Sequence, residues 1–342
     1  MVTMKAAVLM KQAPVDTSPL RVEAVPVPAM GVDDVLIRVH ACGVCRTDLH
    51  VVEGDLAPRK MPIIPGHQVV GIVEEAGANV RSVARGERVG AAWLRSTCGQ
   101  CRFCTSGREN LCERAEFNGW TADGGFAQFM AAPARFVYTL PGGFSDTQAA
   151  PLLCAGIIGY RAMKLTGLDQ RRDGWKGAKL GIYGFGAAGH VVIQLARGRG
   201  AQVYVCTRDH ERHQSLAREL GAAWTGNATE PPPEKLDAAI IFAPAGEIVP
   251  AALAALDKGG VLVLGGIYMS DIPQMEYRLL YGERVIRTVA NNTREDGQEF
   301  LNEAAALPVR THVQVFAFDR VNEALQSLKN DAIRGAAVIK ID

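Results

Sequence analysis

The sequence predicts an α/β protein with two domains, one rich in β-strands and one built on a doubly wound parallel sheet. Its 342 residues exceed the ~100–200 residues of a typical single domain. In the N-terminal part, short apolar alternations are separated by Gly, Pro and Asp, which is typical of antiparallel strands. From about residue 151 onward, strands alternate with helices, which is the pattern of parallel βαβ units.

The N-terminal part is expected to form a small antiparallel barrel or sandwich. Its first strand starts close to Met1, where we find no apolar stretch and cleavage site of the kind that marks a secretory signal. The strands that the alternation predicts are Lys5–Met10, Val35–Val39, Gly71–Glu75 and Arg88–Ala92.

The second part opens with Pro151–Leu165, whose apolar residues have helical spacing. Each later helix is expected to connect two parallel strands. The predicted strands are Lys179–Tyr183, Gln202–Cys206, Asp237–Phe242 and Val261–Leu264. The predicted helices between them are His190–Arg197, Glu211–Leu220 and Ile248–Leu256.

The C-terminal tail is too short for a further domain. It is predicted to contain two helices and a last strand, over Gly297–Ala306, Arg320–Asn330 and Ala336–Ile341. We expect this tail to complete the first domain. That domain would comprise residues 1–152 and 290–342, and residues 153–289 would form the second.

The composition excludes several classes of function. Lys and Arg total 37 and Asp and Glu total 36, so no basic excess is available to bind nucleic acid or an anionic membrane. No segment approaches the roughly 18 consecutive apolar residues of a membrane helix. We expect a cytoplasmic protein, whose eight cysteines would not form disulfides.

Four of the cysteines predict a metal site. Cys98, Cys101, Cys104 and Cys112 place four soft thiolates in one loop, which suits tetrahedral zinc without an open position. Such a site would order the loop and would be closed to substrate. An iron–sulfur cluster uses related spacings and stays open as an alternative, as do unligated cysteines.

A glycine fingerprint predicts dinucleotide binding. Gly184, Gly186 and Gly189 follow a predicted strand and open a predicted helix, with Ala187 and Ala188 between the last two. The first glycine allows a tight turn, the second lets the backbone approach a pyrophosphate, and the third lets the helix pack on the strand. The N-terminus of the helix would then face the phosphates.

A third constellation combines Cys45, His67 and Cys154. The first lies in CGVCRTDLH, which ends at His50, and the second lies in PGHQVVG. On spacing alone, a lone histidine is more often structural and a buried cysteine is usually a small apolar side chain.

The sequence resembles the zinc-dependent medium-chain dehydrogenases, and most of all bacterial alcohol dehydrogenases. The resemblance rests on four motifs in this order: CGVCRTDLH, PGHQVVG, the four cysteines from Cys98 to Cys112 (called the cysteine ladder below) and GFGAAGH. The resemblance runs from about Met4 to the end of the chain. It implies a GroES-like catalytic domain that binds zinc, a Rossmann nucleotide-binding domain, two Zn²⁺ ions per chain and NAD(P)(H). The implied reaction moves a hydride between this cofactor and a small primary or aromatic alcohol or its aldehyde.

The resemblance makes Cys45, His67 and Cys154 the ligands of a catalytic zinc, whose fourth position takes water or the substrate oxygen. The cysteine ladder would hold the structural zinc. One position departs from the family, because many relatives carry glutamate where this chain has Gln68. A neutral amide is a poorer transient ligand, so zinc exchange and turnover are expected to differ.

Three residues of CGVCRTDLH gain roles from the resemblance. Thr47 and His50 resemble the proton relay that connects the bound alcohol to solvent. Asp48 resembles the carboxylate that orients the zinc histidine. The alternatives are a surface histidine at His50 and a turn or capping aspartate at Asp48.

The cofactor preference depends on the residues after the second strand of the βαβ region. In the N-terminal part, Arg46 resembles a residue that contacts the pyrophosphate of the cofactor. Thr207 takes the position of the acidic residue that binds the ribose of NAD, and Arg208 follows it. A hydroxyl and a guanidinium suit a 2′-phosphate, so NADP(H) is favoured. A shifted register would bring in Asp209 and favour NAD(H).

The substrate and the assembly are less constrained. Trp93 and Trp120 are candidates for an aromatic pocket wall, or for core residues. Relatives form dimers or tetramers, so we expect a homodimer or homotetramer that pairs a sheet edge near Arg284–Ala290. The rival functions are a zinc polyol dehydrogenase, an enone or quinone reductase of the same superfamily, a non-catalytic nucleotide-binding protein and a zinc-ribbon interaction module.

Overall fold

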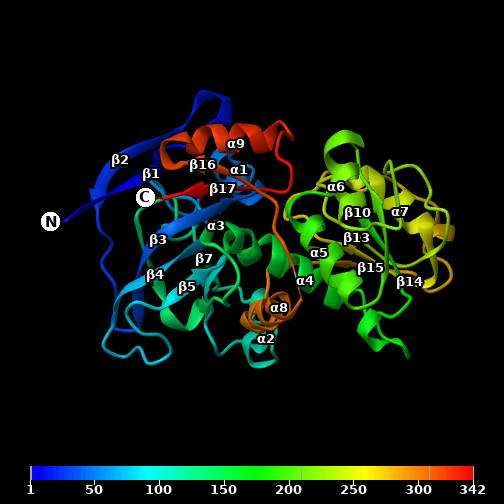
Figure 1. Ribbon diagram of the computed structural model, residues 1–342, viewed down its shortest axis with the longest axis horizontal. Coiled ribbons are helices and arrows are strands. Elements are labelled where there is room, and N and C mark those ends of the chain that lie inside the picture. Colours follow the sequence, from blue (N-terminus) through cyan, green and yellow to red (C-terminus); the bar gives the residue numbers. More distant parts are fainter. Residues whose placement is uncertain (1, 209, 308, 342) are drawn as a thin grey trace. The chain divides into compact units, whose positions relative to one another are not determined.

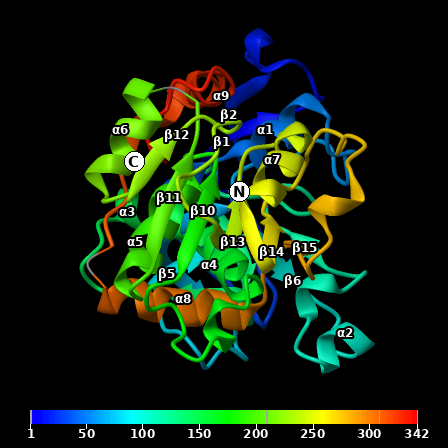
Figure 2. The same cartoon turned by 90° about the vertical axis from the view of Figure 1, so that its right-hand side faces the viewer.

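The computed structural model describes residues 2–208, 210–307 and 309–341. The chain forms two compact units (Figures 1 and 2). Unit 1 comprises Met1–Cys154, Asn291–Ala305 and Thr311–Asp342. Unit 2 comprises Ala155–Ala290 and Ala306–Arg310.

Unit 1 is built on a seven-stranded sheet in the order β16-β17-β3-β4-β5-β9, with β8 also paired to β3. All pairs are antiparallel except β16 with β17. The strands are β3 (Asp34–Val44), β4 (Gln68–Ala76), β5 (Arg88–Ala91), β8 (Phe129–Pro133), β9 (Val137–Thr139), β16 (Val313–Ala317) and β17 (Ala336–Lys340). Because β17 pairs with β3, the C-terminal tail completes this unit (Figure 1).

Smaller elements complete unit 1. Two two-stranded sheets pair β1 (Thr3–Leu9) with β2 (Leu20–Pro26) and β6 (Leu94–Ser96) with β7 (Glu116–Phe117). The helices are α1 (Arg46–Glu53), α2 (Arg102–Thr105), α3 (Asp146–Ala149), α8 (Arg294–Ala306) and α9 (Val321–Lys329). The core is apolar and includes Leu9, Ile37, Phe126 and Ile339.

Unit 2 contains a parallel six-stranded sheet in the order β12-β11-β10-β13-β14-β15, whose central strands lie side by side in Figure 2. The strands are β10 (Lys179–Tyr183), β11 (Gln202–Cys206), β12 (Trp224–Gly226), β13 (Leu236–Ile241), β14 (Leu256–Leu264) and β15 (Val285–Thr288). The helices are α4 (Ala155–Leu165), α5 (Ala187–Gly198), α6 (Ser215–Glu219) and α7 (Val249–Ala255). The predicted fold class is confirmed, with a Rossmann-like unit and a β-rich unit.

Several helix boundaries differ from the prediction. The helix expected over Gly297–Ala306 begins three residues earlier, at Arg294. The helix expected over Pro151–Leu165 is α only from Ala155, because Cys154 has φ −135° and ψ −69°, outside the helical region. A 3₁₀ turn precedes it. The helix expected from His190 begins earlier, at Ala187, directly after its cap Gly186. The first half of the helix expected over Glu211–Leu220 is a π-helix.

The chain carries no disulfide among its eight cysteines, all of which are described as free thiols. Within the described ranges, every helix is too short or too polar to cross a membrane.

Candidate active site and metal centres

Cys45, His67 and Cys154 come together in unit 1 although they are far apart in the sequence. Their ligand atoms all lie within 4.8 Å of one another. Cys45 Sγ is 3.3 Å from His67 Nε2. Two thiols and an imidazole are a donor set that fits Zn²⁺ and leaves one coordination position for a further ligand.

Local sequence explains how two of these side chains are positioned. Cys45 caps α1, because its Sγ accepts from Thr47 N at 3.4 Å while Asp48 accepts from Cys45 N at 2.9 Å. Gly66 has φ +96°, and a Cβ there would lie 2.9 Å from Cys42 Sγ. Only glycine therefore fits before His67.

Asp48 holds the imidazole from the other side. Its Oδ1 lies 2.9 Å from His67 Nδ1 and accepts from Gly66 N at 3.2 Å. Both side chains are almost fully buried, with 0% and 2% exposed for His67 and Asp48. A proton on Nδ1 directed at this carboxylate leaves Nε2 as the nitrogen that could bind a metal.

The three candidate ligands influence one another's protonation. Burial disfavours a charged His67, but the Asp48 carboxylate and the Cys45 thiolate outweigh it and raise the pKa of His67 to about 10. The hydrogen bond with Cys154 lowers the pKa of Cys45 well below its usual value, and the same bond raises the pKa of Cys154. Cys45 therefore ionises readily, and the thiolate is the form that binds metal.

Thr47 and His50 both lie on α1 and are both buried. His50 Nδ1 is 2.7 Å from Asp55 Oδ2, and the Asp55 side chain is 41% exposed. The imidazole is thus linked to a carboxylate at the surface. Asp55 was not predicted from the sequence, because its contact with His50 forms only on folding.

An aromatic wall stands beside His67. Trp93 is buried, and its ring meets that of His67 edge-on at a centroid distance of 5.0 Å. Trp93 also stacks on Phe117 at 5.1 Å and on Trp120 at 5.8 Å. The Trp120 indole is fixed by a 3.0 Å bond from Nε1 to Ala57 O. Phe117 was not foreseen from the sequence.

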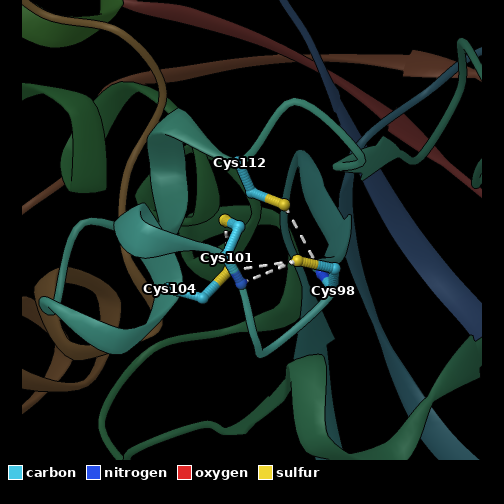
Figure 3. Close-up of side chains that lie close together, drawn as sticks. All are labelled: Cys98, Cys101, Cys104 and Cys112. Atoms are coloured by element: carbon cyan, nitrogen blue, oxygen red, sulfur yellow. Dashed lines mark hydrogen bonds between the residues drawn. The ribbon is translucent and has the colours of Figure 1, made fainter.

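The four cysteines of the ladder converge around α2 (Figure 3). Their Sγ atoms lie within 4.8 Å of one another, with 3.5 Å between Cys101 and Cys104 and 3.9 Å between Cys98 and Cys104. Cys112 Sγ accepts from Cys98 N at 3.5 Å. Four thiols in this arrangement could hold a tetrahedral metal ion with no open position.

Hydrogen bonds from the backbone of Gln100 and of Cys101 are among the interactions that lower the pKa of Cys98 to about 5. Glu109, which lies between the last two cysteines, forms an ion pair of 2.8 Å with Arg294 and accepts from Arg294 N at 2.9 Å. Because the partners are 185 positions apart, no local signal could have predicted this contact between the ladder and α8.

The glycine fingerprint lies between β10 and α5 in unit 2. Gly184 has φ +84°, and a Cβ there would lie 2.7 Å from Ala243 N. A Cβ on Gly186 would meet nothing within 4 Å, so the backbone is open to a ligand at this point. A Cβ on Gly189 would lie 3.0 Å from Phe185, where the helix packs on the turn. Ala187 and Ala188 form the first turn of α5.

Thr207 and Arg208 follow β11 directly. Thr207 is buried, with its N donating to Gly226 O at 2.8 Å and its O accepting from Gln214 at 2.9 Å. Arg208 is exposed. The alternative register rests on Asp209, which lies outside the described residues.

Two further predicted residues belong to unit 1. Arg46 is half-buried and is the first residue of α1. Gln68 is buried at the start of β4, opposite Gly43. A Cβ on Gly43 would lie 2.8 Å from Gln68 Cδ, so the glutamine side chain packs against the glycine backbone.

Known families account for most of the chain. The family "Alcohol dehydrogenase GroES-like domain" matches residues 31–142, and the family "Zinc-binding dehydrogenase" matches residues 187–306. A Mycobacterium tuberculosis protein named "Probable alcohol dehydrogenase AdhA" is 46% identical over 345 residues, covering 99% of this chain and 98% of that protein. The chain belongs to the zinc-binding alcohol dehydrogenase family.

Other members of the zinc-binding alcohol dehydrogenases are also similar along their whole length. An alcohol dehydrogenase of Geobacillus stearothermophilus is 37% identical, covering 95% of this chain and 97% of that protein. The solved structure of a cinnamyl alcohol dehydrogenase from Sorghum bicolor has a TM-score of 0.88 at 27% identity, with coverage of 99% and 98%.

Membership in this family confirms the predicted enzyme class. The chain is an oxidoreductase that acts on CH–OH groups, with small-molecule alcohols and aldehydes as substrates and with zinc and NAD(P) as cofactors.

Proposed function

We propose that this alcohol dehydrogenase moves a hydride between NADP(H) and small primary or aromatic alcohols and their aldehydes, at a zinc site made by Cys45, His67 and Cys154. The observation that carries the proposal is the convergence of the three ligand atoms within 4.8 Å, with Asp48 on the opposite nitrogen of the imidazole. When bound, zinc polarises the substrate oxygen, and the nicotinamide donates or accepts the hydride.

The protein's own task in alcohol oxidation is to remove the hydroxyl proton. Thr47 accepts this proton, and His50 passes it towards solvent. Two observations support Thr47 as the first proton acceptor. It is buried, and its backbone N donates to the candidate zinc ligand Cys45 Sγ at 3.4 Å. Asp55 orients the His50 ring through the 2.7 Å contact with Nδ1 and stabilises the imidazolium that forms during transfer.

The aromatic wall favours flat substrates. Trp93 and Trp120 are nearly parallel, with 13° between their ring planes, and the edge-on contact places Trp93 beside His67. A conjugated aldehyde or benzylic alcohol would stack on such a wall. The similarity to a cinnamyl alcohol dehydrogenase supports this substrate class.

The cofactor preference follows from Thr207 and Arg208, the residues directly after β11. An exposed guanidinium beside a hydroxyl can hold a 2′-phosphate by charge-assisted bonds. Arg46 contributes a further cationic group for the pyrophosphate. The open backbone at Gly186 supports phosphate binding at the start of α5.

A second zinc, held by Cys98, Cys101, Cys104 and Cys112, would be structural. Two ions per chain are therefore proposed, one in each cysteine-containing group. In this proposal residues 1–152 and 290–342 form the catalytic domain and residues 153–289 the nucleotide-binding domain. Gln68, where many relatives carry glutamate, would alter zinc exchange and turnover.

We further propose a homodimer or homotetramer. β15 is the edge strand of the parallel sheet, and Val285 on it is exposed. The exposed Tyr277 and Tyr281 precede this strand in the sequence. An edge with apolar neighbours suits pairing with a second copy of the chain. The eight free thiols suit the reducing environment of the cytoplasm.

The test is a comparison of oxidation and reduction rates on protein of known zinc content. A panel of aliphatic, allylic and aromatic alcohols and aldehydes is assayed with NAD(H) and NADP(H) side by side. Turnover that prefers NADP(H) and aromatic substrates supports the proposal. A preference for NAD(H) contradicts the role of Thr207 and Arg208, and no turnover on any alcohol or aldehyde by zinc-loaded protein contradicts the proposed reaction.

A further inference from the structure

Unit 1 contains a cavity to which the proposed dehydrogenase reaction assigns no role. Its volume is about 580 Å³, within the usual range of small-molecule sites. Among the described residues, the candidate zinc ligands and the aromatic wall do not line it. Its walls are mainly apolar and include Met4, Val8, Val25, Ile63, Phe129 and Met130.

One cation in this cavity has unused hydrogen-bonding capacity. Arg95, on β6, lines the cavity and is half-buried. Its Nη1 donates to Ala131 O at 2.6 Å and to Asn118 Oδ1 at 3.2 Å. Within the described part of the chain, its Nε and Nη2 make no hydrogen bond and no ion pair. A guanidinium in this state can still bind a carboxylate through two donors.

The acidic groups around Arg95 do not neutralise it by direct contact. Burial lowers the pKa of Arg95, although Asp34, Glu116 and Asp123 act in the opposite direction. Each of these carboxylates is engaged elsewhere, accepting at 2.9 Å, 2.8 Å and 3.1 Å from Gly31 N, Ser96 Oγ and Ile64 N.

The other cation at the cavity is already paired. Lys60 Nζ lies 2.5 Å from Asp123 Oδ2, and both residues line the cavity. Their charges compensate each other, which leaves Arg95 as the cation with donors to offer.

We propose that this cavity is a separate binding site for a small amphipathic carboxylate. The carboxylate accepts hydrogen bonds from Nε and Nη2 of Arg95, and the apolar body packs on the methionine, valine and isoleucine side chains. The site does not depend on the proposed dehydrogenase function, since it shares no residue with the metal site.

The test uses calorimetric titration of the zinc-loaded protein with octanoate and octanamide. Octanoate is expected to bind about tenfold more tightly than octanamide, because only the carboxylate pairs a negative charge with the guanidinium and accepts through two equivalent oxygens. Arg95→Met should remove this difference. Arg38→Met is the matched control, because Arg38 is an exposed arginine of the same unit that is paired with Glu74, and it should change nothing.

A second variant protects the test against misfolding of Arg95→Met. Ala29 lines the cavity from an exposed position, so Ala29→Phe should obstruct the cavity without disturbing the core, and should weaken octanoate binding at least about tenfold. Equal affinities for octanoate and octanamide overturn the proposal. So does octanoate binding that Arg95→Met or Ala29→Phe leaves unchanged, because the anion then binds elsewhere, including the metal site.

Discussion

Asp48 Oδ1 lies 2.9 Å from His67 Nδ1, in a pair that is almost completely buried. The same carboxylate also accepts from the backbone of Cys45 and Gly66, at 2.9 Å and 3.2 Å. One side chain therefore connects the start of α1 to the segment that carries the imidazole. The geometry of the proposed zinc site depends on this connection.

Asp48→Asn should weaken zinc binding at this site by about 10–100-fold, because an amide orients and polarises the imidazole less well than a carboxylate does. Chelator competition measures the loss. Asp146→Asn is the matched control, because Asp146 forms a similar 2.9 Å contact with His40 Nδ1 and neither residue belongs to either cysteine-containing group. Equal zinc affinity in the two variants would show that Asp48 has no orienting role.

Cys104→Ser should remove one of the two zinc ions and destabilise unit 1, since metal binding there contributes to folding. A loss of about 2 kcal/mol would lower the melting temperature by roughly 4–8 °C. Metal analysis and thermal denaturation measure both effects. Cys206→Ala, a buried thiol of unit 2, should keep both ions. A variant that retains two zinc ions would argue against the ladder as a metal site.

Arg208→Ala should lower kcat/KM for NADPH about 10–100-fold and leave the value for NADH nearly unchanged, because the charge-assisted contact exists only with the 2′-phosphate. Arg218→Ala is the control, since Arg218 belongs to the same unit and donates to Thr225 Oγ1 at 2.8 Å. Parallel losses with the two cofactors would rule out 2′-phosphate recognition by Arg208.

The ion pair between Glu109 and Arg294 should make stability depend on pH. Burial opposes ionisation of Glu109, but hydrogen bonds from Arg294 outweigh it and lower the pKa of the carboxyl. The pair therefore stabilises the fold above the unfolded-state pKa of about 4.3, and this stability is lost as the pH falls through the lower folded-state value.

Glu109→Gln should accordingly cost about 1 kcal/mol at pH 7, since Arg294 is partly exposed, and should cost less as the pH falls below about 4. Denaturant titrations at several pH values measure this. Glu74→Gln, which affects exposed contacts with Arg38 and Arg85, should have little effect at any pH. A cost for Glu109→Gln that is constant with pH would contradict the linkage.

The parts of the fold that the sequence predicted well are those with local signals. The ends of β10 and β11 agree with the prediction, because apolar runs bounded by glycine and polar residues define them. The start of α4 was wrong, since nothing in Pro151–Leu153 distinguishes a 3₁₀ turn from an α-helix. The π-helical start of the segment at His210–Gln214 was likewise invisible.

In the candidate site, too, the residues with local sequence signals were predicted and those without such signals were not. The ladder was identified from spacing alone because its four cysteines lie in one loop. Cys154 has no local signature, and only the family resemblance connected it with Cys45 and His67. Asp55 and Arg294 were missed because their roles arise from contacts that folding creates, at 2.7 Å to His50 and 2.8 Å to Glu109.

The proposed pair of zinc sites is tested most directly by a crystal structure with anomalous diffraction measured at the zinc absorption edge. We expect two peaks per chain, one bound by Cys45 Sγ, His67 Nε2 and Cys154 Sγ and one bound by the four thiolates of Cys98, Cys101, Cys104 and Cys112. A peak at the ladder alone, in protein that oxidises alcohols at full rate, would contradict the proposed catalytic zinc.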